Sequence, residues 1–148
     1  MADRREQILS RLVEIAEGLP GVAAVYRNRS KADDDKKPAV VILDADEAVA
    51  SGPAGTSRAS SPASIVEMTP QVFIHVAGSG SSAGPAVNEW RAAWLKAVLT
   101  DAGLRALVGS NGSIRYVGLA TAFGWGRSMD GELGIEIAFA YPLIPSEL

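Results

Sequence analysis

Apolar and polar residues alternate most regularly close to the C-terminus, over residues 131–141. Every second position there is apolar, and the face so formed carries Leu133, Ile135, Ile137, Phe139 and Tyr141. The positions between them are small or acidic, namely Glu132, Gly134, Glu136, Ala138 and Ala140. A period of two with β-branched and aromatic residues on one side predicts a strand with one face on a core. The other face is expected to be solvated or to meet another copy of the chain.

Further strands are predicted in four stretches, residues 22–29, 39–44, 65–77 and 113–123. The run 39–44 is apolar almost throughout, which predicts a central strand buried on both faces. In the stretch 65–77 one face carries Val66, Met68, Val72, Ile74 and Val76. Pro70 lacks an amide donor, so a sheet edge or a bulge is expected at that point.

Helical spacing of apolar residues appears in two places. Residues 3–18 predict an amphipathic helix, in which Asp3 and Glu6 form a capping-box-like pair at the start. A second helix is predicted over residues 86–100, with a stripe of Val87, Trp90, Trp94, Ala97 and Val98. Asp101 is expected to cap a short extra turn over residues 102–108.

This order of elements predicts an α+β fold in one domain, residues 1–148. The sheet is expected to be mainly antiparallel, with four to five strands and two helices packed on one face. An antiparallel sheet can leave its other face to water, and in an assembly that face can meet the next subunit.

The connecting segments differ in composition. Residues 31–37 are charged and predict a solvated loop, and residues 142–148 predict an extended tail. Residues 48–63 are rich in Gly, Ala, Ser and Pro, which predicts a long flexible loop with no core side chains. In the turn 124–131, Trp125 lies between two glycines. An exposed tryptophan is a candidate contact residue.

Composition restricts the class of protein. Apolar residues make up 47% and charged residues 21% of the 148 residues, values typical of a soluble globular domain. The chain has no cysteine, which excludes a disulfide framework and thiolate metal sites and fits a reducing cytoplasm. Neither a signal peptide nor a membrane span is predicted. A net charge of −3 argues against a protein that grips a phosphate backbone, although a ring that faces passing DNA stays compatible.

Candidate chemistry is sparse. Asp44, Asp46 and Glu47 could bind a divalent cation or act in acid–base catalysis, but a charged strand end is the favoured interpretation. His75, the one histidine, is expected at a surface or interface. An enzyme would need these four residues to converge, and their spacing gives no reason to expect that. No catalytic residue, cofactor or metal site is predicted, and the chain is not expected to be an enzyme.

Several soft motifs nevertheless occur in a recognisable order. A short amphipathic helix leads to Pro20-Gly21-Val22 and to the sequence Val-Tyr-Arg-Asn-Arg over residues 25–29. A Pro-Ala-Val-Val strand ends in Asp-Ala-Asp-Glu over residues 38–47, and a long loop, a second helix and a final Phe-Ala-Tyr run follow. In this order the chain resembles the tail terminator proteins, also called minor tail or tail completion proteins, of long-tailed bacteriophages and phage-like particles.

The resemblance implies a ring, usually a homohexamer, that caps the head-proximal end of the tail tube, ends tube polymerisation and joins the tail to the neck. Its implied partners are other copies of itself, the tail tube protein and a head-completion or neck protein. DNA would pass through the ring without sequence-specific binding. The implied location is the tail–neck junction of the virion, after synthesis in the host cytoplasm and without a membrane. Two alternatives stay open, a head-completion or neck adaptor and a non-viral α+β domain that binds a small molecule or peptide.

Two sets of residues are candidates for these contacts. The subunit or partner contacts are expected among Arg58, Glu67, His75, Trp125, Arg127, Glu132 and Glu136. A DNA-facing lumen is expected to use basic residues that lie close together in the sequence, Arg27, Arg29, Lys36 and Lys37, although ordinary solvated charge is the favoured interpretation for them.

Overall fold

The fold is described from a computed structural model, over residues 3–29, 35–51, 64–76, 83–123 and 131–148. Its elements, in chain order, are α1 (Arg4–Glu17), β1 (Ala24–Arg27), β2 (Ala39–Leu43), β3 (Glu47–Ser51), β4 (Ser64–Met68), β5 (Gln71–Val76), α2 (Ala83–Leu99), α3 (Ala102–Val108), β6 (Ser113–Phe123), β7 (Gly131–Leu143) and the 3-10 turn η2 (Pro145–Glu147). Within these ranges no helix combines the length and the apolar character needed to cross a membrane.

Strand β7 organises the sheet. One edge of β7 pairs with β5 and then with β4, while the other edge pairs with β6. Beyond them β2 pairs with β5, β3 pairs with β4, and β1 pairs with β2. Of the strand pairs in the described ranges, β1–β2 is parallel and the others are antiparallel. The predicted α+β fold with a mainly antiparallel sheet is therefore confirmed.

The strand count was predicted too low, because the described residues alone form a sheet of seven strands instead of four or five. The stretch expected as one strand, 65–77, is divided into β4 and β5. Thr69 and Pro70 lie at the break, and Pro70 has no N–H with which to continue a ladder. A third helix, α3, also forms where only a short extra turn was expected.

Strand β3 corrects the expectation of a loop over residues 48–63, because Glu47–Ser51 pairs with β4. The prediction was wrong since it required a strand to bury side chains. Residues 47–50 are all exposed, and β3 is held by its backbone pairing with β4 and by one side-chain hydrogen bond, which the Tyr141 hydroxyl donates to Glu47. The rest of that segment, residues 52–63, lies outside the described residues.

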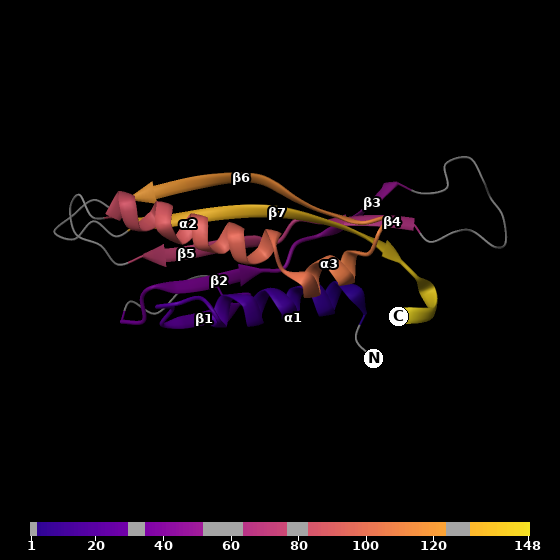
Figure 1. The fold of residues 1–148 in the computed structure, drawn as a ribbon, viewed down its shortest axis with the longest axis horizontal. Coiled ribbons are helices and arrows are strands. Elements are labelled where there is room, and N and C mark those ends of the chain that lie inside the picture. Colours follow the sequence, from indigo (N-terminus) through magenta and orange to yellow (C-terminus); the bar gives the residue numbers. More distant parts are fainter. Residues whose placement is uncertain (1–2, 30–34, 52–63, 77–82, 124–130) are drawn as a thin grey trace.

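The three helices cover one face of the sheet (Figure 1). Buried residues of α1, α2 and α3 join the inward side chains of β2, β4, β5 and β7 in one hydrophobic cluster. The predicted cap of α1 is confirmed, since the Glu6 N–H donates to Asp3 Oδ1 at 2.8 Å. Asp101 caps α3 as expected and also binds Arg11 at 2.7 and 3.0 Å, which links α3 to α1.

The C-terminal segment is not the extended tail that was expected. Strand β7 runs on to Leu143, and residues 145–147 then form a 3-10 turn. Arg4 fixes this turn, because its guanidinium donates to both carboxylate oxygens of Glu147 at 2.7 and 3.1 Å. A third bond from Arg4 reaches the Leu107 carbonyl at 3.2 Å. The prolines of this segment suggested an extended tail, and nothing in the sequence indicated that Arg4 and Glu147, which are 143 residues apart, form an ion pair.

Candidate interaction surface

The sheet face opposite the helices, called the outer face below, has an apolar centre. The register places Tyr26, Val41, Phe73 and Gly134 in one row across β1, β2, β5 and β7. Val41 is 2% exposed, and a second hydrophobic cluster on this face contains no residue of a helix. The expectation that β2 is buried on both faces is thus confirmed. The outer face is not uniformly small and polar, and this apolar centre was missed.

Phe73 shapes this centre through its contact with Gly134. A Cβ added at Gly134 would lie 3.1 Å from Cε1 of Phe73, tighter than an ordinary contact, so glycine lets the ring lie against β7 without a shift. Beside the ring lies an open hollow of about 370 Å³. Its floor and walls come from β5, β6 and β7 and include Gln71, Phe73, Gly118, Ala120, Gly134 and Glu136. Small residues opposite an aromatic ring create the hollow.

Polar side chains surround this apolar centre. His75 and Glu132 face each other with Nδ1 and Oε2 4.0 Å apart. Gln71 donates from Nε2 to Glu136 at 3.2 Å. Further along the sheet, Arg115 of β6 reaches across β7 to Glu67 of β4 at 3.4 Å. An apolar centre with a polar, partly acidic rim is typical of a protein–protein contact surface.

Four of the predicted contact residues therefore lie on the outer face, on three neighbouring strands: Glu67 on β4, His75 on β5, and Glu132 and Glu136 on β7. Their part in a contact stays a prediction. The other three, Arg58, Trp125 and Arg127, lie outside the described residues.

The basic residues expected at a lumen do not form one group. Arg27 lies between two carboxylates, donating to Glu6 at 2.8 and 2.9 Å and to Asp44 at 2.9 Å twice. Hydrogen bonds from Arg27 hold the pKa of Glu6 at about 2 and lower the pKa of Asp44. The charge of Arg27 is therefore compensated within the chain. Arg29 lies over the ring of Tyr26, 4.3 Å from its centroid. A lumen-facing role for Arg27, Arg29, Lys36 and Lys37 stays a prediction.

Acidification should weaken the ion pairs by which Arg27 of β1 joins Glu6 of α1 to Asp44 at the end of β2. The pKa of Glu6 falls from 4.5 to about 2 in the folded chain, so the ion pair stabilises the fold above pH 4.5 and its contribution is lost as the pH falls toward 2. Since the Glu6 side chain is 46% exposed, the loss is modest, about 1 kcal/mol or less. Thermal unfolding should show a steeper fall of Tm with acid for the wild type than for Arg27→Gln. Arg115→Gln, which removes an exposed pair, should retain the wild-type slope, and parallel slopes in all three would contradict the prediction.

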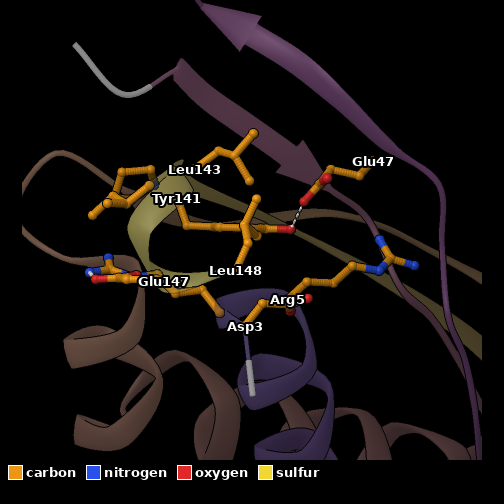
Figure 2. A pocket seen from close by; sticks show the side chains of 10 residues that line it. Asp3, Arg5, Glu47, Tyr141, Leu143, Glu147 and Leu148 are labelled. Carbon is orange, nitrogen blue, oxygen red and sulfur yellow. Dashed lines mark hydrogen bonds and ion pairs between the residues drawn. The ribbon is translucent and has the colours of Figure 1, made fainter. Parts of the chain in front are cut away.

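Two carboxylates of the acidic strand end, Asp44 and Glu47, are held by different partners. Asp44 is bound by Arg27, whereas Glu47 accepts a hydrogen bond from the Tyr141 hydroxyl, in a pocket that Arg5 also lines (Figure 2). Burial, and then Glu47, raise the pKa of Tyr141. Arg5 donates to the Ala45 carbonyl at 2.5 Å. Among the described residues no three His, Asp or Glu side chains are placed to share a metal ion.

Sequence reasoning missed Phe73 and Gly134 as site residues. The signal was weak but present, since Phe73 interrupts the polar face of its strand and Gly134 is the smallest residue on the outer side of 131–141. Their pairing depends on the register between β5 and β7, which the sequence does not show. Comparison of the chain with protein-family models and with curated proteins finds no match.

Proposed function

We propose that this chain is a structural ring subunit that caps the head-proximal end of a phage tail tube, as the tail terminator proteins do. The observation that carries the proposal is the outer face, because it has a buried apolar centre, a hollow and a polar rim without a covering helix among the described elements. Such a surface suits a protein contact better than chemistry. The order of sequence motifs supports the choice of family.

A ring subunit makes head-to-tail contacts that close on themselves, so each copy needs two different contact surfaces. In the proposed ring one surface of each copy meets the next copy, and the two open ends of the ring face the tail tube and the neck. The ring ends polymerisation because it offers the neck a surface that the tube protein cannot extend. DNA passes through it, held by no sequence-specific contact, and the particle location is the tail–neck junction.

The first test is the mass of the assembly in solution. Size-exclusion chromatography with light scattering, followed by native mass spectrometry, should show a closed species of about six copies. Added to polymerising tail tubes, the ring should shorten them and should appear at one end in electron micrographs. A chain that stays monomeric at every concentration, with tubes of unchanged length, would overturn the proposal.

The hollow beside Phe73 favours a second candidate, a non-viral domain that binds a small apolar ligand or a peptide side chain. Its volume of about 370 Å³ lies at the lower end of ordinary ligand pockets. A monomer in which a hydrophobic dye binds the wild type and fails to bind Phe73→Ala would support this candidate. If the protein instead forms a ring and no dye binds in the hollow, this second candidate is excluded.

A further inference from the structure

Strand β6 is a long edge of the sheet. Of its 11 residues, 113–116 and 118–123 pair with β7 on one side, and no described strand pairs with the other side. Natural edge strands are usually short, or carry Lys or Pro, or are covered, because open N–H and C=O groups bind other strands. Strand β6 contains neither Lys nor Pro, and its one charged residue, Arg115, is engaged with Glu67. Its single irregularity, near Val117, leaves regular stretches on both sides.

Strand β3 forms a different edge, on the opposite side of the sheet. Because β4 and β6 both pair with residues 139 and 140 of β7, they must occupy opposite edges of β7. Strand β3 pairs with the far side of β4, and no described strand pairs with β3 beyond that. Its centre, Ala48-Val49-Ala50, is apolar and exposed. None of these three side chains is buried, so within a single copy they add little to the backbone pairing that holds β3.

The exposed apolar side chains mark the same two edges. Among the described residues, three large hydrophobic side chains are exposed, Val49 on β3 at 65%, Val117 on β6 at 44% and the terminal Leu148 at 72%. Two of the three thus lie on strands whose backbone is open on one side. An open backbone edge beside an exposed valine is suited to strand addition by another chain.

We propose that β6 of one copy pairs with β3 of the next copy, so that the sheets of neighbouring subunits join edge to edge. The two edges are different and lie on opposite sides, which makes the contact head-to-tail and allows a ring to close. Backbone hydrogen bonds supply the contact, and Val117 and Val49 are covered within it. This inference rests on the proposed function in taking a second copy as the partner.

The experiment uses one lysine on each edge. Val117→Lys and Val49→Lys should each place a charge in the contact and raise the concentration needed for assembly by more than about tenfold. Each variant keeps one intact edge, so an equal mixture of the two, with one of them 15N-labelled, should form one-to-one dimers that grow no further in native mass spectrometry. Leu148→Lys, which is also exposed but lies on neither strand, should assemble as the wild type does. Circular dichroism and thermal unfolding check each fold, and Thr121→Lys replaces Val117→Lys if the latter unfolds.

The outcomes separate this inference from the proposed function. A wild-type ring that survives Val117→Lys, Thr121→Lys and Val49→Lys overturns the edge contact and leaves the ring standing. Assembly that is lost in Val117→Lys but kept in Val49→Lys overturns β3 as the partner of β6. The wild type could also assemble into open chains or pairs instead of a ring. If both variants abolish that assembly, the edge contact is supported and the ring is overturned. A wild type that is monomeric at every concentration overturns both.

Discussion

Gly112→Ala is expected to lower the free energy of unfolding by about 3 kcal/mol or more and Tm by roughly 10 °C. Gly112 lies in the turn from α3 to β6, next to the backbone of both α3 and β7. An added Cβ would overlap the carbonyl oxygens of Val108 and Ala140 and would lie 2.7 Å from the Val108 carbonyl carbon. These are backbone atoms of a helix end and of the central strand, so neither can move away without disturbing its own hydrogen bonds.

Gly118→Ala is the matched control for Gly112→Ala. Gly118 lies on β6, only a few residues away, and an added Cβ there would meet no atom within 4 Å. Its substitution should change the free energy of unfolding by about 0.5 kcal/mol or less. Urea unfolding followed by circular dichroism measures both variants. If Gly112→Ala unfolds at the wild-type midpoint, the turn does not approach β7 as closely as the structure shows.

The elements that could be predicted are those with a local signal. The alternation over residues 131–141 predicted β7 because the core face of this strand is decided by its own side chains. The start of α1 was likewise predicted, since its cap and its apolar stripe lie within a few turns of one another. Gly112 had no such signal, because the atoms that require glycine there belong partly to β7, which lies far along the chain.

Strand β3 and the Phe73–Gly134 pair show why the remaining features could not be predicted. Strand β3 forms because β4 offers it a backbone partner, and its small exposed residues resemble those of a loop. Phe73 covers Gly134 only in the register that β5 and β7 adopt. Both depend on pairing between segments whose own composition leaves the register open.

The charged candidates were grouped by closeness in sequence, and the structure groups them differently. Arg27 was placed with Arg29 because they are two residues apart, yet its partners are Glu6 and Asp44. Alternation alone would place positions 27 and 29 on the same face, but β1 ends at Arg27 and Asn28 has a φ of 58°, so the chain turns there and Arg29 lies over Tyr26 instead. The four contact candidates on the outer face lie within strands, where alternation gives the face of each residue once the pairing is known.

Trp94→Ala should be among the most destabilising substitutions in the helices, lowering the free energy of unfolding by about 3–5 kcal/mol. Trp94 is 1% exposed, and its side chain has the largest volume among the fully buried side chains of the described residues. It lies against α1 and the sheet, among Leu12, Pro70, Val72, Ile135, Ile137 and Phe139. Truncation would leave a cavity between these layers, which a rigid sheet cannot close. Trp90→Ala, one turn earlier and only half-buried, should cost clearly less.

Trp94→Phe separates the packing of this ring from its polar atom. No described atom accepts a hydrogen bond from the indole N–H of Trp94, and a buried donor without a partner costs about 1–3 kcal/mol. Phenylalanine keeps most of the ring contacts and removes that donor, so the two effects oppose each other and the net loss should stay below about 1.5 kcal/mol. Urea unfolding by circular dichroism, with m-values compared among the variants, measures both substitutions. If Trp94→Phe is as costly as Trp94→Ala, the indole N–H has a partner in solution and the role of Trp94 is polar as well as apolar.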